Sequence, residues 1–161
     1  MIERQNQNTK LAGDEILRRK FGTPDIPVST SISESMAHYI ESADFFFIAT
    51  SNRAGECDSS YRGKRKGVAA VKILDEKTII FPDYLGNGSF RSLGNILENS
   101  HVGMLFMDFH TGMRIRVNGE AEINDSPEWL KLFPKSLQTV KVTVREAYMQ
   151  NRPVGTSEKG G

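Results

Sequence analysis

Apolar residues occupy every second position from Met113 to Ile123, with Gly119 as the exception, and polar residues fill the positions between them. Successive side chains of a β-strand point to opposite faces of the sheet, so this pattern predicts a strand with one apolar and one polar face. It is the clearest strand in the sequence, and it requires a fold in which a sheet buries one face against a core.

Five further runs rich in β-branched and aromatic residues predict short strands, at residues 45–50, 68–74, 78–81, 102–107 and 140–144. Helices are expected at 9–21, from a cap at Ser31 or Ser33 to about Ala43, at 90–99, and as a turn at 126–130. Short connections favour antiparallel pairing, and the absence of strand–helix alternation disfavours a doubly wound sheet. Six strands in a chain of this length commonly close into a small barrel, because closure removes exposed edges.

The length of 161 residues, or 18.0 kDa, suits a single domain spanning 1–161, and we expect residues 1–8 and 151–161 to be loose ends. Lys and Arg total 21 against 20 Asp and Glu, a balance that disfavours a nucleic-acid coat. The single cysteine excludes an internal disulfide, and three scattered histidines predict no metal site. The longest apolar run is too short to span a membrane, and no signal-peptide pattern opens the chain, so a cytoplasmic location is expected.

The first segment suited to chemistry is Asp58–Gly67, which combines hydroxyls, arginines and lysines between glycines. Arginine offers a planar fork of donors to an oxyanion, and serine adds a further donor. Three interpretations stay open for this segment. It could bind a phosphate, it could form a solvated basic hairpin, or its basic residues could contact nucleic acid, although it lacks interleaved aromatic residues for base stacking.

Two further segments could bind an anion. Residues 81–95 form a glycine-rich turn that enters a helix, so backbone N–H groups and the helix dipole could face a phosphate, although a simple capped helix explains the pattern equally well. The turn matches neither the P-loop nor the dinucleotide pattern. In the predicted strand, Arg114 and Arg116 share one face about 7 Å apart, where they could meet an anion or pair with neighbouring glutamates.

No arrangement of residues indicates a nucleophile or an acid–base pair. Cys57 is expected in a turn without a histidine partner nearby in sequence, so we expect a free surface thiol, and the nucleophile motif GxSxG is absent. The catalytic residues are therefore unassigned. If the protein catalyses a reaction, a cofactor would supply the reactivity.

The ordered set of segments between about Asp44 and Glu122 carries a resemblance. Its pieces are Phe47–Ser51, Gly55, Asp58–Ser60, Arg62–Gly63, Thr78–Tyr84, Gly86–Asn87, Ser92–Ile96, Asn99, Val102–Phe106 and Arg114–Gly119. Together they resemble the FMN-binding split-barrel family, the group related to pyridoxamine 5′-phosphate oxidase. The resemblance implies a six-stranded antiparallel Greek-key split barrel, mainly β with flanking helices. It also implies a homodimer that holds FMN at the subunit interface.

The resemblance also implies which residues contact the flavin. The first flavin-contacting strand would carry Ser59, Ser60, Arg62, Lys64 and Lys66, and the loop beside the phosphate would carry Tyr84, Asn87, Ser89 and Arg91. Arg114 and Arg116 would lie on the strand that crosses near the flavin ring or the partner subunit. Charge near N1 of the ring would stabilise reduced, anionic flavin.

Departures from the pyridoxamine phosphate oxidases limit the functional prediction. The turn at Tyr84–Asn87 lacks their lysine, and the C-terminal stretch lacks their substrate-holding Arg and Pro segment. We therefore expect an FMN-dependent oxidoreductase that acts on another, unidentified small molecule. Three alternatives stay open: a flavin-binding sensor or storage module without turnover, a related barrel that uses a deazaflavin or haem, and a nucleic-acid role for Lys64–Lys66.

Overall fold

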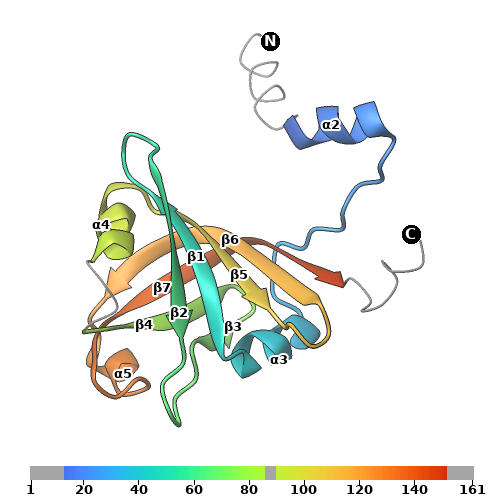
Figure 1. Ribbon diagram of the computed structural model, residues 1–161. Coiled ribbons are helices and arrows are strands. Elements are labelled where there is room, and N and C mark those ends of the chain that lie inside the picture. The colour runs from blue at the N-terminus through green and yellow to red at the C-terminus, as the bar shows by residue number, and fades with distance from the viewer. Residues whose placement is uncertain (1–12, 86–89, 152–161) are drawn as a thin grey trace.

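The computed structural model describes residues 13–85 and 90–151. Seven strands form one antiparallel sheet in the order β2-β1-β5-β6-β7-β4-β3 (Figure 1). The strands are β1 Phe45–Ser51, β2 Cys57–Gly63, β3 Lys72–Asp75, β4 Thr78–Tyr84, β5 His101–Met107, β6 Met113–Asn124 and β7 Ser136–Asn151. The helices are α2 Gly13–Phe21, α3 Glu34–Ser42, α4 Arg91–Glu98 and α5 Pro127–Leu130. The prediction of a mainly β, antiparallel fold with flanking helices is confirmed.

The predicted count of six strands is not confirmed, because the structure adds β2. This strand pairs with β1 along its whole length, from Phe45 opposite Gly63 to Ser51 opposite Cys57. Its side chains that share a face with the core are Asp58, Ser60 and Arg62, so it lacks the apolar alternation that marks the other strands. β2 and β3 lie at the two ends of the sheet order, and no ladder between them is seen in the described residues.

The core fills the inside of the curled sheet and is covered by two helices. α3 is capped by Ser33, whose Oγ accepts a hydrogen bond from the N–H of Met36 at 3.2 Å, and it buries Met36 and Ile40. Ile32, the residue immediately before the cap, is also buried in the same core cluster. α4 buries Leu93 and Ile96 against the sheet. Both helices match the elements that the sequence predicts there.

The longest pairing in the sheet joins β6 and β7, with Met113 opposite Asn151 at one end and Asn124 opposite Thr139 at the other. A β-bulge at Asn118 and Gly119 shifts the register within this ladder. The predicted strand at 140–144 is therefore only the middle of β7. The predicted strand at 68–74 is shorter in the structure, where β3 begins at Lys72.

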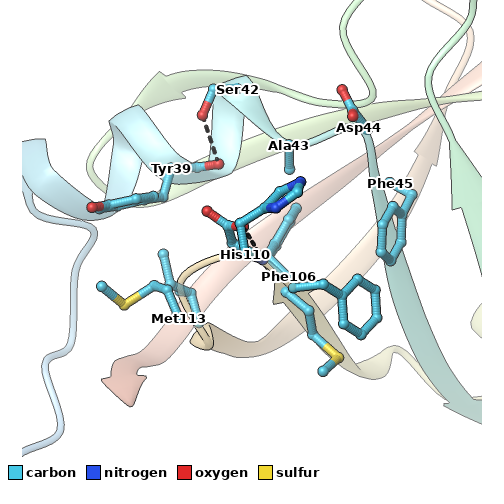
Figure 2. Close-up of a pocket in the computed structure, with 12 residues that line it drawn as sticks. Tyr39, Ser42, Ala43, Asp44, Phe45, Phe106, His110 and Met113 are labelled. Atoms are coloured by element: carbon cyan, nitrogen blue, oxygen red, sulfur yellow. Dashed lines mark hydrogen bonds between the residues drawn. The ribbon is translucent and has the colours of Figure 1, made fainter. Parts of the chain in front are cut away.

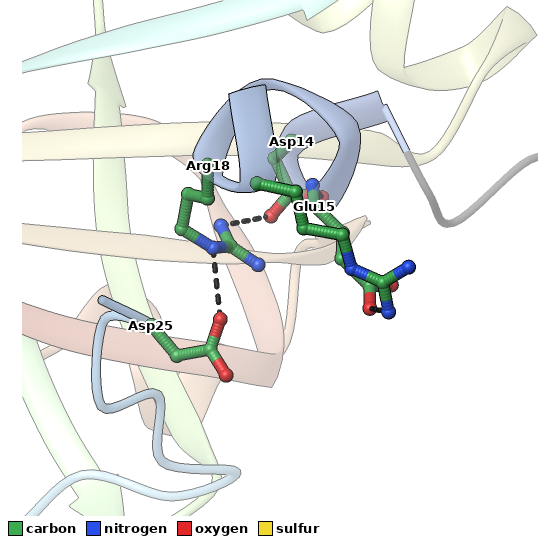
Figure 3. Close-up of polar contacts among 5 residues, drawn as sticks. Asp14, Glu15, Arg18 and Asp25 are labelled. Atoms are coloured by element: carbon green, nitrogen blue, oxygen red, sulfur yellow. Dashed lines mark hydrogen bonds and ion pairs between the residues drawn. The ribbon is translucent and has the colours of Figure 1, made fainter. Parts of the chain in front are cut away.

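The helix α2 stands apart from the sheet, and none of its residues is buried (Figure 1). Its side chains pair locally instead: the Arg18 guanidinium contacts Asp14 at 2.7 Å and Asp25 at 2.9 Å (Figure 3). The first residues of the predicted helix at 9–21 lie outside the described residues. So do the predicted loose ends, except for residue 151. Among the helices that the structure describes, none is long and apolar enough to cross a membrane.

Candidate functional site

A buried ion pair joins two strands that are far apart in the sheet order. Nη1 of Arg62 on β2 donates to Oδ1 of Asp83 on β4 at 3.2 Å and to the carbonyl oxygen of Pro82 at 3.4 Å. Four strands separate β2 from β4 in the sheet, so this contact shows that the sheet curls back on itself. Both side chains are more than nine-tenths buried. The guanidinium also lies 5.4 Å from the ring centroid of Phe81.

Two buried polar atoms of this pair, Nε of Arg62 and Oδ2 of Asp83, have no hydrogen-bond partner within the described residues. The same is true of Oη of Tyr84, which follows Asp83 in sequence but packs with Ile80 and Phe133. A buried polar atom without a partner costs roughly 1–3 kcal/mol, so such a cluster calls for a ligand or an ordered water. Burial raises the pKa of the Tyr84 phenol, and the nearby Arg65 guanidinium, 4.0 Å from the ring centroid, opposes that shift. The phenol therefore stays protonated at neutral pH and can donate a hydrogen bond.

The N-terminal end of α4 is attached to the same part of the sheet. Oγ of Ser92 lies 3.0 Å from Oγ of Ser60 on β2, and Nδ2 of Asn95 donates to Oγ1 of Thr50 at 3.1 Å. These contacts fix the helix above β1 and β2. Arg91, the first residue of α4, is exposed at the end where the helix dipole is positive.

The predicted flavin-contacting residues thus divide into groups. Ser60 and Arg62 on β2 contact Ser92 at the start of α4 and Asp83 on β4, and we call these four residues, with their sequence neighbours Tyr84 and Arg91, the Arg62 cluster. Lys64 and Lys66 are exposed just beyond β2, and Nζ of Lys64 contacts Asp44 at 2.8 Å. Asn87 and Ser89 lie outside the described residues.

Ser59, Arg114 and Arg116 belong to the opposite face of the sheet, which we call the outer face. Residues directly opposite one another in paired strands point to the same side, and one such row across this face is Tyr61, Phe47, Leu105, Arg116 and Tyr148. Nη1 of Arg116 donates to Oη of Tyr148 at 3.4 Å. β6 lies three strand spacings, about 14 Å, from β2 along the sheet. The two arginines therefore do not join the Arg62 cluster within one chain.

A groove of about 440 Å³ crosses the outer face beside that aromatic row. Two small residues, Ala49 on β1 and Gly103 on β5, form its floor. On its β6–β7 side, Nδ2 of Asn118 donates a hydrogen bond to Oε1 of Glu146 at 2.7 Å. Cys57 lines the groove as an exposed free thiol, as predicted. Among residues 13–85 and 90–151, no group of three or more His, Cys, Asp and Glu side chains is placed to hold a metal.

Sequence reasoning did not select Asp83, Ser92 or Asn118 as site residues. Asp83 carried a usable signal, because it is a charged residue at the end of an otherwise apolar strand. Such a residue is rarely buried without a partner. Ser92 and Asn118 gave no such signal, since their roles depend on contacts with β2 and β7.

The sequence matches the family described as pyridoxamine 5′-phosphate oxidase over residues 32–154. The chain belongs to the pyridoxamine 5′-phosphate oxidase family. No curated protein matches the chain.

Solved structures show the same fold. A putative pyridoxamine 5′-phosphate oxidase from Lactobacillus delbrueckii has a TM-score of 0.60 and 18% identity, covering 74% of this chain and 95% of its own. HupZ of Group A Streptococcus has a TM-score of 0.57 and 20% identity, covering 77% and 96%. A structure described as F420 reductase has a TM-score of 0.50 and 18% identity, covering 74% and 98%. These similarities establish the architecture of the pyridoxamine 5′-phosphate oxidase family.

Proposed function

We propose that this chain is an FMN-binding protein of the pyridoxamine 5′-phosphate oxidase family, and that it acts as an oxidoreductase on an unidentified small molecule in the cytoplasm. The observation that carries the proposal is the Arg62 cluster, in which Nε of a buried guanidinium has no hydrogen-bond partner within the part of the chain that the structure describes. Family membership supports the cofactor class, because flavins are common cofactors among relatives.

The residues around Arg62 suit a phosphate monoester. Lys64, Arg65 and Lys66 follow β2 as exposed cations, and Arg91 lies at the positive end of the α4 dipole. Arginine donates two parallel hydrogen bonds to a phosphate, and each charge-assisted bond is about twice as strong as a neutral one. Asp83 would hold the Arg62 side chain in one orientation, and the neutral Tyr84 phenol would add a donor.

When bound, the flavin would supply the redox chemistry, accepting a hydride equivalent from a reductant and passing electrons to an acceptor. The chain would contribute binding, orientation and the exclusion of water. In this proposal Arg62 and Arg91 bind the phosphate. Tyr84 keeps its proton on Oη and donates it as a hydrogen bond to the ligand. No residue of the Arg62 cluster is assigned as an acid or base for the substrate.

The outer face supports a homodimer that completes the flavin site. Proteins of this family are typically dimeric, and the outer face carries an exposed aromatic stack in which Phe45 lies 5.3 Å from Tyr61 and 5.8 Å from Phe109 between ring centroids. Arg114 and Arg116 lie on the same face. In the proposed dimer, this face would meet the partner and these arginines would lie near the flavin ring, where positive charge stabilises the reduced anion.

Titration calorimetry with FMN and with riboflavin tests the phosphate assignment. We expect FMN to bind more tightly than riboflavin, and Arg91→Gln to weaken FMN binding about tenfold through the loss of one charge-assisted contact, with riboflavin binding unchanged. Lys20→Gln on α2 removes one positive charge away from the sheet and serves as the matched control. Equal affinities for FMN and riboflavin in the native protein would refute the assignment.

Two other functions remain distinguishable from this one. The similarity to a structure described as F420 reductase favours a deazaflavin as the second candidate cofactor, and the absorption spectrum of the bound molecule separates it from FMN. A binding module without turnover would hold the flavin but fail to reduce it. Rapid reduction of the bound flavin by NADH or NADPH, followed by reoxidation in air, would support the enzyme.

A further inference from the structure

A cavity of about 290 Å³ lies at the end of the sheet away from α4, under the C-terminal end of α3 (Figure 2). Its walls come from four parts of the chain: the last turn of α3, the start of β1, the end of β5 with the hairpin that follows it, and the start of β6. The volume is slightly below the roughly 300–1,000 Å³ of typical ligand sites, so it suits a small organic molecule rather than a nucleotide. None of the residues of the Arg62 cluster lines it.

Aromatic rings and thioethers form most of the apolar wall. Tyr39 on α3, Phe45 on β1, Phe106 on β5 and Phe109 in the hairpin each line the cavity. The face of an aromatic ring carries partial negative charge and attracts a cation. The methionines at positions 107 and 113 add polarizable sulfur atoms to the same wall. Aromatic faces and sulfur atoms that reach the cavity would attract a cationic organic group more strongly than a neutral one of the same shape.

Negative charge gathers at the same cavity. Asp44 and Asp108 both line it, and α3 points its negative C-terminal end toward it with no basic residue in the last turn. Oδ1 of Asp108 accepts hydrogen bonds from the backbone N–H groups of His110 at 2.9 Å and Thr111 at 3.4 Å. These bonds hold the pKa of the Asp108 carboxyl below its ordinary value, so this wall stays anionic at neutral pH.

A lysine and a histidine lie beside these carboxylates. Nζ of Lys64 contacts Oδ1 of Asp44 at 2.8 Å, which neutralises that carboxylate in part. His110 lines the cavity with its imidazole. Asp108 makes no ion pair within 4 Å with any described residue, and the neighbouring His110 is a further cause of the lowered pKa of its carboxyl.

We propose that this cavity binds a small organic cation, such as a quaternary ammonium or a similarly sized alkylated amine, through aromatic faces and the Asp108 carboxylate. The site lies apart from the Arg62 cluster, and it shares Phe45 and Phe109 with the outer face that is proposed to meet the partner. The protein would thus bind a second ligand in addition to the flavin. Neither a purely apolar cavity nor a phosphate site would select such a cation.

Choline and its uncharged isostere 3,3-dimethylbutan-1-ol test the proposal directly, because they share shape and differ in charge. Each is titrated into the full-length protein, as purified, while NMR follows the methyl groups of Met107 and Met113 in the cavity wall. We expect saturable shifts of these methyls with choline and at least tenfold weaker binding of the alcohol. Equal binding of both probes, choline shifts confined to other methionines, or no binding of choline would overturn the proposal.

Two variants assign the source of the selectivity. Asp108→Asn keeps an oxygen that can accept the N–H groups of the hairpin but removes the charge, and we expect it to weaken choline binding about fivefold with no effect on the alcohol. Asp125→Asn, an exposed residue in the loop after β6, is the matched control. Phe109→Leu replaces a 71% exposed ring by an apolar side chain, and we expect a two- to fivefold loss for choline. A choline affinity unchanged by both Asp108→Asn and Phe109→Leu would place binding elsewhere.

Discussion

Among the ion pairs of the described residues, Arg62–Asp83 is the one with both partners buried, and its environment explains why the two residues act as a unit. Taking two charges out of water is costly, and their mutual attraction repays that cost only while both are present. The pair also joins β2 to β4 across the inside of the sheet, so its loss affects two distant strands. At this scale the residues of the Arg62 cluster have a structural role that is independent of any ligand.

A double-mutant cycle measures that coupling. We expect Asp83→Leu and Arg62→Met each to lower the free energy of unfolding by about 3–5 kcal/mol, because each leaves an unpaired buried charge. The double variant removes both charges and should recover most of the loss. Chemical denaturation of the four proteins provides the measurement. Additive losses in the double variant would contradict a coupled pair.

Asp108 gives a pH prediction at the same scale. Backbone N–H groups of His110 and Thr111 hold the pKa of its carboxyl below the ordinary value, so the ionised form favours the folded state. The stabilisation is present above the pKa of the unfolded chain and is lost as the pH falls through the lower pKa of the folded state. An NMR titration of the Asp108 side-chain carboxyl should show the lowered pKa. A midpoint at or above that of an ordinary aspartate would contradict these hydrogen bonds.

Individual residues of the site were only partly predictable from the sequence. Arg62 and Tyr84 could be selected because arginine, tyrosine and glycine gather in two short segments. The pairing of Arg62 with Asp83 could not be predicted, since it depends on a curl of the sheet that brings together two residues 21 positions apart in sequence. The separation of Arg114 and Arg116 from that cluster likewise follows from strand order, which local patterns do not encode.

At the scale of elements, the β-bulge in the β6–β7 ladder shows where the backbone leaves no room for a side chain. A Cβ added at Gly119 would overlap the backbone carbonyl oxygen of Thr143 on the paired strand. Gly94 on α4 has open space around its Cα instead. Alanine at Gly119 would therefore clash with the paired strand, whereas alanine at Gly94 would meet no other atom, and the two substitutions form a matched pair.

We expect Gly119→Ala to lower the free energy of unfolding by about 1–3 kcal/mol or more, as overpacked substitutions do, because the two strands must separate. Gly94→Ala should stabilise the protein by about 0.5–1 kcal/mol through the higher helix propensity of alanine. Thermal or chemical denaturation of both variants provides the comparison. Equal effects of the two substitutions would contradict the close approach of β6 and β7 at the bulge.

Element prediction succeeded where the apolar pattern was strong and failed where a strand was polar. β6 was predictable because its alternation is nearly complete, and α3 because Ser33 caps an apolar stripe. β2 was not predicted, because the polar residues Asp58, Ser60 and Arg62 occupy its inward positions. Its partners there are α4 and β4, which supply hydrogen bonds in place of apolar contacts.

At the scale of the whole molecule, the outer face presents the aromatic surface that a monomer leaves in water. Tyr61 is 62% exposed and Phe109 is 71% exposed, and both stack on Phe45. Exposed apolar patches of this kind mark interaction surfaces. The typical dimerisation of the family makes a second copy of this chain the expected partner.

Sedimentation measurements test this surface. We expect the native protein to sediment at twice 18.0 kDa, and Tyr61→Arg to sediment as a monomer because it places a charge in the apolar contact. Leu97→Arg changes an exposed leucine on α4 and serves as the control, with the dimer retained. A dimer unaffected by Tyr61→Arg would show that the copies associate through another surface.

The family and the mainly β architecture were predictable, because an ordered set of segments between Asp44 and Glu122 carries them across about half of the chain. The number of strands and the cavity under α3 were not, since both arise from contacts between distant segments. The proposed use of FMN depends on the Arg62 cluster, which only the fold assembles.

The proposed cofactor can be identified from the spectrum and mass of the small molecule that copurifies with the protein. We expect a yellow protein with flavin absorption maxima, which on denaturation releases a molecule with the mass of FMN. A colourless protein that also fails to take up added FMN would contradict it.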